Sequence, residues 1–206
     1  MAQIITIHPE TPQERNISQV VDLLKGGAVA VLPTDSGYAL ACTLENKDAR
    51  EQICRIRAVD KYHNFTLLCH DLSELSVYSH VDNQVFRLIK NNTPGPYTFI
   101  LKATKEVPRR LMNEKKKTIG LRVPSNPIMQ SLLRHLDEPL MSVSLILPDS
   151  EVAENDPYEI DDRLGNCVDV IVDGGYLVEK PTTVISMLDD KVEIVRVGQG
   201  DTKPFE

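Results

Sequence analysis

The stretch that decides the fold is Gly26-Gly27-Ala28-Val29-Ala30-Val31-Leu32-Pro33-Thr34-Asp35-Ser36-Gly37-Tyr38. Before it, residues 15–25 place apolar side chains at helical spacing, and the two glycines favour the left-handed turn that ends a helix. Residues 28–32 are typical of a buried strand, which Pro33 ends because proline lacks a backbone N–H. The polar residues after Pro33 therefore follow a strand directly, where α/β sheets often bind ligands, although an ordinary turn would carry the same residues.

Helical and strand patterns alternate along the rest of the chain and give way to strands at its end. We expect helices at 48–57 and 127–136 and others starting near 71, 82 and 156, and strands at 66–69, 97–102, 118–123, 140–146 and 168–172. Residues 183–187 and 191–197 are typical of a hairpin with a turn at Asp189-Asp190. The pattern predicts a single α/β domain over residues 1–206, with helices packed on a twisted mixed sheet. The polar stretch 102–117 predicts a loop or an irregular helix.

Composition excludes several classes of protein. Hydrophobic residues make up 41% and charged residues 26% of the 206, which excludes a disordered chain. No apolar run reaches the roughly 18 residues that span a bilayer, so we expect no membrane association. The cysteines form no C-x-x-C pair and the histidines are scattered, which predicts no structural metal site and buried free thiols in a reducing cytoplasm. The four cysteines are Cys42, Cys54, Cys69 and Cys167.

Charge is distributed unevenly along the chain. The net charge of −7 argues against a protein that coats nucleic acid without selection. Eight basic residues nevertheless fall between Lys102 and Arg122, against only Glu106 and Glu114. A solvated face would explain this segment, and so would a basic rim around nucleotide phosphates or RNA. The candidates for RNA contact are Arg109, Arg110, Lys115, Lys116 and Lys117.

Isolated polar residues suggest a ligand pocket, although the P-loop, G-x-G-x-x-G and G-x-S-x-G motifs are absent. Arg122 and Arg196 each interrupt an apolar strand, where a charge needs a carboxylate partner or an anionic ligand. Ser142 and Ser144 share one face of a strand. The Arg55-x-Arg57 pair ends a helix, where it complements the helix dipole or, with Lys61, clamps phosphates. Together these residues predict a cationic pocket for an anionic or zwitterionic ligand.

The same clusters, taken in order, resemble the YrdC/YciO family. The opening stretch resembles its G-G-x-V-x-x-P-T-[ED]-T-x-Y-G-L signature, and residues 94–101 (PGPYTFIL) resemble its P-G-P-x-T-x-I-L segment. Residues 118–124 resemble its x-x-G-x-R-x-P segment, and 168–175, 181–184 and 195–198 resemble its closing motifs. The resemblance covers nearly the whole chain, and residues 55–57, 63–66 and 81–83 look closest to the YciO branch.

The resemblance implies a YrdC-like α/β fold with a concave basic cavity and a nucleotidyltransferase activity. Members of the family condense ATP, held with Mg²⁺, with L-threonine and bicarbonate to give threonylcarbamoyl-AMP and pyrophosphate, which serves the threonylcarbamoyladenosine modification of tRNA. Breakdown of that adenylate would use the same pocket. The alternative is a non-catalytic protein that binds double-stranded RNA or associates with the ribosome, as family members are also described as binding such RNA.

Site residues follow from the resemblance position by position. It implies catalytic roles for Arg55, Arg57 and Ser144. It implies threonine contacts for Ser36, Arg122, Ser142 and Thr182, and nucleotide contacts for Arg55, Arg57, Thr118, Ser144 and Arg196. Two motifs depart from the family pattern: its K-x-R is Arg55-Ile56-Arg57 here, and its S-x-N is Ser144-Leu145-Ile146.

Overall fold

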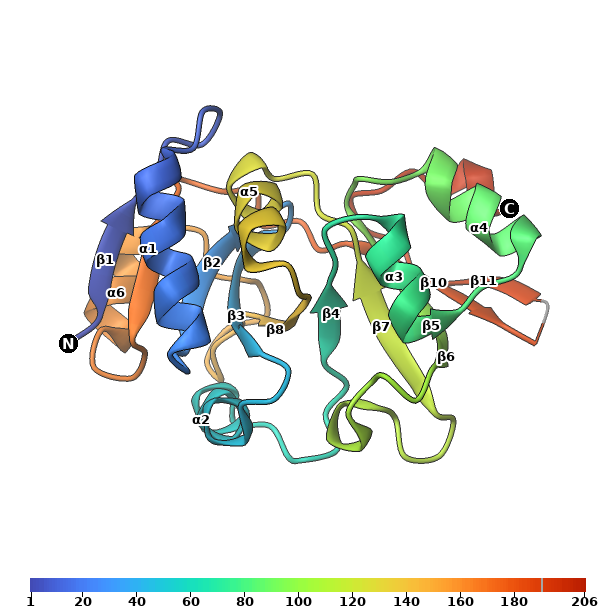
Figure 1. Ribbon diagram of the computed structural model, residues 1–206, viewed down its shortest axis with the longest axis horizontal. Coiled ribbons are helices and arrows are strands. Elements are labelled where there is room, and N and C mark those ends of the chain that lie inside the picture. Colours follow the sequence, from blue (N-terminus) through green and yellow to red (C-terminus); the bar gives the residue numbers. More distant parts are fainter. Residues whose placement is uncertain (190) are drawn as a thin grey trace.

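The computed structural model describes residues 1–189 and 191–206, and over these residues the chain forms one 11-stranded mixed sheet with helices packed on it (Figure 1). The predicted fold class is confirmed. Asp190, half of the expected turn at Asp189-Asp190, lies outside the described residues. The elements are β1 (Gln3–Thr6), α1 (Glu14–Lys25), β2 (Ala30–Thr34), β3 (Gly37–Thr43), α2 (Lys47–Arg57), β4 (Thr66–Leu68), α3 (Leu72–Tyr78), β5 (Ser79–His80), α4 (Asn83–Asn91), β6 (Tyr97–Ala103), the 3-10 helix η1 (Arg109–Leu111), β7 (Thr118–Arg122), α5 (Pro127–Leu136), β8 (Leu140–Ser144), α6 (Pro157–Leu164), β9 (Val170–Asp173), β10 (Thr183–Leu188), β11 (Lys191–Arg196) and the 3-10 helix η2 (Lys203–Phe205).

The strands lie in the order β1-β9-β2-β3-β8-β4-β7-β6-β10-β11, and β5 pairs with β6 beside this path. The pairs β1–β9, β2–β9, β4–β7 and β6–β10 are parallel, and the other pairs are antiparallel. Strands from both ends of the sequence therefore meet in one sheet, and β9 lies between β1 and β2.

The end of the sheet that contains β2 is covered on both faces. Side chains alternate between the faces of a strand, so Ala30 and Leu32 pack into the core under α1 and α5, while Val31 joins the core on the opposite face. The helices α1 and α5 contribute apolar stripes that include Ile17 and Leu132, both fully buried. Apolar side chains therefore cover both faces at this end of the sheet.

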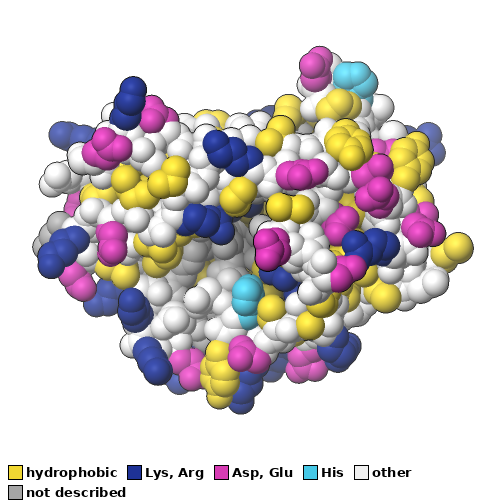
Figure 2. Space-filling view, turned by 180° about the vertical axis from the view of Figure 1, so that it is seen from behind, with side chains coloured by type: hydrophobic (Ala, Val, Ile, Leu, Met, Phe, Trp, Pro, Cys, Tyr) yellow, Lys and Arg dark blue, Asp and Glu magenta, His cyan; other side chains and the backbone are white. Residues whose placement is uncertain are grey.

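The other end of the sheet is covered on one face only. Phe99 of β6, Leu121 of β7 and Ile185 of β10 join the same core as Leu75 of α3 and Ile89 of α4. The residues that alternate with them face the other way, where the molecule is hollowed near its centre and Lys and Arg side chains lie at the rim of the hollow (Figure 2). The missing cover on this face creates the cavity described below.

The hairpin at Pro33 corrects one predicted boundary. The strand β2 continues through Pro33 to Thr34 and then turns directly into β3, a strand that the sequence pattern did not predict. Proline is tolerated there because β9 pairs only with Ala30 and Val31, so no neighbour on that side needs the missing N–H. Gly37 has a φ of 84°, and a Cβ on it would lie 2.9 Å from the Cβ of Ala153, so glycine is required at this turn.

The four thiols are free, but they are not all buried. Cys42 and Cys69 are buried in the sheet, whereas Cys54 is half-buried and Cys167 is exposed in the turn between α6 and β9. The expectation of buried thiols is therefore wrong for Cys167, because its position between two elements leaves it outside the apolar core. Among the described residues, none of the helices is both long and apolar enough to cross a membrane.

Candidate functional site

The floor of the cavity is a row of side chains that crosses five strands. Ser186 lies opposite Ile100, Ile100 opposite Gly120, Gly120 opposite Thr66, and Thr66 opposite Ser142. All five residues line one cavity of about 620 Å³. The register of the sheet thus brings together residues that are more than 100 positions apart in the sequence.

Gly120 leaves the middle of this floor open. A Cβ built on it would lie 3.2 Å from Oγ1 of Thr66 and 3.5 Å from Cγ2 of Thr98. Because its backbone does not adopt a positive φ, space rather than conformation is what glycine provides here. Because Gly120 has no side chain, its backbone itself forms the floor of the cavity at this point.

Most of the residues expected at the site line this cavity. Those that do are Arg57, Lys116, Thr118, Arg122, Ser142, Ser144, Thr182 and Arg196. They come from α2, from the strands β7, β8 and β11, and from the segments before β7 and β10. The tertiary structure therefore gathers three arginines and several hydroxyl groups around one space.

Arg122 is a buried cation without a hydrogen-bond partner for two of its nitrogens. Its exposed fraction is 5%, and neither Nε nor Nη2 has a partner among the described residues. Burial lowers the pKa of the Arg122 guanidinium, while the charge of Asp35 raises it and that of Arg196 lowers it. Asp35 accepts hydrogen bonds instead from the backbone N–H groups of Ser125 and Asn126, at 3.0 and 2.7 Å. The structure thus retains a charge that an anionic group entering the cavity would offset.

The hydroxyl groups around Arg122 are oriented by neighbouring strands. Ser142 Oγ donates to the carbonyl oxygen of Thr66 at 3.2 Å, and the hydroxyl oxygens of Thr98 and Thr182 lie 2.8 Å apart. Arg196 donates from Nε and Nη2 to the carbonyl oxygen of Thr182, at 3.1 and 2.9 Å. These contacts fix the side chains and leave lone pairs of the hydroxyl groups available to a ligand.

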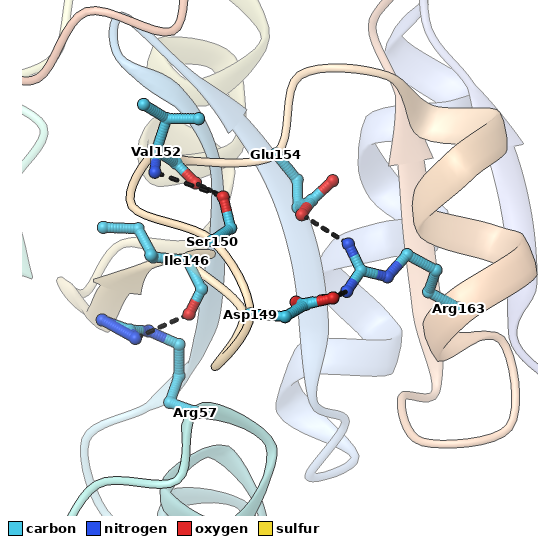
Figure 3. A network of polar contacts seen from close by, with 7 residues as sticks. All are labelled: Arg57, Ile146, Asp149, Ser150, Val152, Glu154 and Arg163. Carbon is cyan, nitrogen blue, oxygen red and sulfur yellow. Dashed lines mark hydrogen bonds and ion pairs between the residues drawn. The ribbon is translucent and has the colours of Figure 1, made fainter.

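Arg57 joins the end of α2 to the chain that follows β8. Its Nε donates to the carbonyl oxygen of Ser144 at 2.7 Å. Its Nη1 donates to that of Ile146, also at 2.7 Å (Figure 3). Both acceptors are neutral, so the positive charge of Arg57 is not cancelled by these bonds. On the other side of the same loop, Arg163 pairs with Asp149 at 2.6 Å and with Glu154 at 3.0 Å (Figure 3). The loop is therefore held by an arginine at each side.

His63 is a titratable group on the cavity wall that the sequence pattern did not single out. Its ring stands edge-on to that of Phe65, with centroids 5.5 Å apart. Burial lowers the pKa of His63, the nearby Arg57 lowers it further, and Asp60 raises it. The net shift favours the neutral form of the ring.

Other expected residues lie outside this cavity. Ser36 is buried in the β2–β3 turn, where its N–H donates to Oγ1 of Thr34 at 3.1 Å. Arg55 is exposed on α2, facing away from Arg57's contacts, and does not line the cavity. The stretch 102–117 is irregular, as expected, with one 3-10 turn. Its basic residues are divided between two cavities: Lys116 lines the main one, Arg109, Arg110 and Lys115 line a second one, and Lys117 lines neither.

Several lining residues were missed from the sequence. Thr98 and Gly120 lie within the family motifs, but the sequence did not mark them as site residues. The wall formed by Ser186, Glu193 and Val195 was not predicted either. The alternation of Val184, Ser186 and Leu188 along β10 was the available signal, because it predicts one face turned away from the core.

The donor set limits which ions the cavity would hold. Among the described residues no group of three or more His, Cys, Asp or Glu side chains is placed to bind a metal ion. Glu193 is the single carboxylate among the described lining residues. Magnesium ions keep several waters and take one or two carboxylates plus substrate phosphates, so this lining fits Mg²⁺ only as an ion that arrives with a nucleotide.

Comparison with known families gives one match. The family model Sua5_yciO_yrdC, described as Telomere recombination, matches residues 22–198. The chain is 63% identical over 205 residues to the YciO protein of Escherichia coli K12, with both chains covered completely. The crystal structure of E. coli YciO superimposes with a TM-score of 0.96 and complete coverage of both chains.

More distant relatives have names that state an activity or a ligand. A putative threonylcarbamoyl-AMP synthase of Methanocaldococcus jannaschii is 28% identical over 201 residues, which cover 95% of this chain and 93% of the relative. The structure of P. abyssi Sua5 complexed with L-threonine has a TM-score of 0.87 at 20% identity and matches 96% of this chain and 58% of that one. This second likeness establishes a shared fold.

Proposed function

Because the chain belongs to the Sua5/YciO/YrdC family, as its sequence motifs indicated, we propose that its main cavity binds an adenylate together with L-threonine and makes or breaks down threonylcarbamoyl-AMP. In this role the protein is a cytoplasmic nucleotidyltransferase-like enzyme linked to the threonylcarbamoyladenosine modification of tRNA. Synthesis would join ATP, L-threonine and bicarbonate and release pyrophosphate and water. Breakdown would add water to the adenylate and release AMP and N-carboxythreonine, which loses carbon dioxide to give L-threonine.

Arg122 is the observation that carries this proposal. A buried guanidinium with two unpartnered nitrogens fits a carboxylate, which accepts two parallel hydrogen bonds from an arginine. The hydroxyl groups of Ser142 and Thr182 lie in the same cavity and would accept hydrogen bonds from the ammonium group and contact the side-chain hydroxyl of threonine. An amino acid with a hydroxyl side chain uses all of these groups at once.

The phosphate end of the adenylate would lie toward Arg57. The charge of Arg57 is not cancelled by its carbonyl partners, so it would stabilise negative charge that develops on a phosphoryl group. Ser144 and Thr118 line the same cavity and would contact the nucleotide, with Arg196 beside them. Neutral His63 would accept a proton from the attacking group. Mg²⁺ bound to the nucleotide would neutralise phosphate charge, with Glu193 the carboxylate within the lining.

Mass spectrometry of the reaction mixture tests the proposal in both directions. The protein is incubated with ATP, Mg²⁺, L-threonine and bicarbonate, and separately with preformed threonylcarbamoyl-AMP, and the adenylate, pyrophosphate and AMP are quantified. We expect either accumulation of the adenylate in the first mixture or its loss with release of AMP in the second. Arg122→Gln removes the charge that would hold the carboxylate and should abolish both, whereas Arg15→Gln, an exposed residue of α1, should change neither.

Absence of both reactions, with no binding of L-threonine in the presence of nucleotide, would overturn the proposal. The alternative of a double-stranded RNA-binding protein has a different signature, because about six phosphate contacts would weaken RNA binding by roughly 10³-fold between 50 and 200 mM salt. Alanine at Lys115 and Lys117, which lie outside the main cavity, would weaken RNA binding and retain the nucleotide, and Arg122→Gln would do the reverse.

A further inference from the structure

A second cavity of about 570 Å³ lies beside the first, and its lining is strongly basic. Its lining residues come from α2, from the chain just after α2, from η1, and from the stretch between η1 and β7. His63 and Asn113 line both cavities, so the two are neighbours. Five cations face one carboxylate, Glu114, among the described lining residues; the cations are Arg50, Lys61, Arg109, Arg110 and Lys115.

Arg50 is a buried cation whose partners are neutral. Its exposed fraction is 8%, and its Nη2 donates to the carbonyl oxygens of Lys61 and Arg110, at 2.8 and 3.2 Å. The guanidinium lies over the ring of Phe65, with its carbon 5.4 Å from the ring centroid, and Nε has no partner among the described residues. None of these contacts cancels the charge of Arg50.

The positive charge of Arg110 is also only weakly offset by its neighbours. Its Nη2 donates to the carbonyl oxygen of Leu44 and lies 3.5 Å from the carboxylate of Glu45, and its Nε has no partner among the described residues. Glu45 is largely exposed, so water screens this ion pair. The two arginines therefore add positive charge to a cavity that Lys61, Arg109 and Lys115 also line. These like charges repel one another unless an anion binds among them.

The chemistry of the lining favours phosphate oxygens. Arginine forks and lysine ammonium groups are the usual protein ligands of phosphate, and several of them around one small space suit an anion that carries several charges. A cavity of about 570 Å³ exceeds what a single phosphate fills and is too small to enclose a nucleic-acid duplex. We propose that this second cavity is a binding site for an oligophosphate anion of the pyrophosphate or tripolyphosphate class.

The anion could reach the site as free inorganic oligophosphate or as the phosphate tail of a nucleotide, and both present the same chemistry. Binding at this site does not depend on turnover in the main cavity, so it can be tested whether or not the proposed function holds. If that function holds, the shared wall at His63 and Asn113 places the second cavity next to the point where pyrophosphate would be released.

Isothermal titration calorimetry at 50 mM salt tests the site with pyrophosphate, tripolyphosphate, ATP and AMP. The test variant, Lys61→Ala with Arg109→Ala and Lys115→Ala, removes three exposed cations that line only the second cavity. Lys105→Ala is the matched control, because Lys105 is an exposed cation of the same basic segment but lines neither cavity. Arg122→Gln alters only the main cavity and therefore reports an anion that binds there. We expect the triple variant to bind pyrophosphate at least about tenfold more weakly, since hydrogen bonds to charged groups contribute strongly, and the Lys105→Ala control to stay within twofold of the wild type.

Comparison of the four ligands distinguishes free oligophosphate from the phosphate tail of a nucleotide. Binding of pyrophosphate with little binding of AMP supports free oligophosphate, and a triple-variant effect confined to ATP supports the nucleotide tail. Unchanged pyrophosphate binding in the triple variant, or its loss in Arg122→Gln alone, would overturn the proposal by moving the anion to the main cavity. Failure of every small anion, combined with duplex RNA binding that the triple variant loses, would also overturn it.

Discussion

Arg57 Nη1 donates to the carbonyl oxygen of Ile146 at 2.7 Å, and this bond joins the last positions of the two motifs that depart from the family's pattern, at Arg55 in the first and at Ile146 in the second. The family's K-x-R ends at Arg57, and its S-x-N ends at Ile146. The isoleucine side chain offers no hydrogen bond, but its main chain still fixes the arginine at the cavity. The departure thus removes a side-chain donor while it keeps the local geometry.

Lysine substitutions at Arg57 and Arg55 form a matched pair on one helix. Arg57→Lys removes the fork that binds two carbonyl oxygens and should lower the free energy of unfolding by about 1–2 kcal/mol. Arg55→Lys keeps the charge on an exposed side chain that lies outside the cavity, so its effect should stay within about 0.5 kcal/mol. Urea denaturation of both variants measures the difference, and equal effects would show that the carbonyl contacts do not stabilise the fold.

Asparagine at position 146 should restore a polar side chain to the cavity. Ile146 lines the cavity and is only half-buried, so Ile146→Asn should fold normally. A new hydrogen bond to a charged group would raise the yield of threonylcarbamoyl-AMP by about tenfold. The yield is measured by mass spectrometry with Ile146→Leu as the control, and an identical yield in all three proteins would show that residue 146 does not limit synthesis.

Methionine in place of Arg122 should separate stability from binding. The substitution removes a buried charge with unpartnered nitrogens and retains an apolar side chain of similar length, so it should stabilise the fold by about 1–3 kcal/mol. Binding of L-threonine should be lost at the same time. Thermal unfolding and calorimetry check the two effects, and a destabilised variant would mean that Arg122 has a partner in solution.

Side chains at Gly120 should fill the floor of the cavity in a graded manner. An alanine Cβ would lie 3.2 Å from Oγ1 of Thr66, and the two further carbons of valine would extend into the space above it. We expect Gly120→Ala to weaken ligand binding modestly and Gly120→Val to weaken it by about tenfold or more, as overpacking displaces a ligand that touches the floor. Equal affinity in both variants and the wild type would place the ligand elsewhere in the cavity.

Protonation of His63 should couple pH to stability and to anion binding. Burial and Arg57 lower its pKa in the folded protein, with Asp60 acting in the opposite direction, whereas the unfolded chain has a pKa of about 6.5. Between the lowered value and about 6.5 only the unfolded chain carries the proton, so the contribution of His63 to stability is present above about pH 6.5 and is lost as pH falls through the folded pKa. Urea midpoints as a function of pH should show this slope, and His63→Gln should remove it.

The same residue gives a prediction for ligands. A bound anion would raise the pKa of His63 from its lowered value, so anion binding should take up protons as pH falls toward that pKa, and should strengthen over the same range. Calorimetry in buffers of different ionisation enthalpy measures the proton uptake. Equal uptake in the wild type and in His63→Gln would show that another group is titrated.

Local patterns in the sequence were sufficient for much of the fold. The apolar period before Gly26, the cap and proline at Asn126-Pro127, and the alternation in residues 183–187 gave the elements α1, α5 and β10 with boundaries close to those observed. The strand β3 was missed because its residues are almost continuously buried, so no alternation of apolar and polar residues marks it.

Short-range periodicity and residues that are close in the chain were enough to predict the fold class, the family motifs and most of the elements. Which polar residues share a space depends on strand register and turns, and so was visible only in the folded structure. The register that aligns Gly120 with Thr66 and Ser142 opens a common floor, and the turn that buries Ser36 sets it apart from that floor. The same reason divides the basic segment between two cavities, since Lys115 and Lys116 are neighbours in sequence but line different walls.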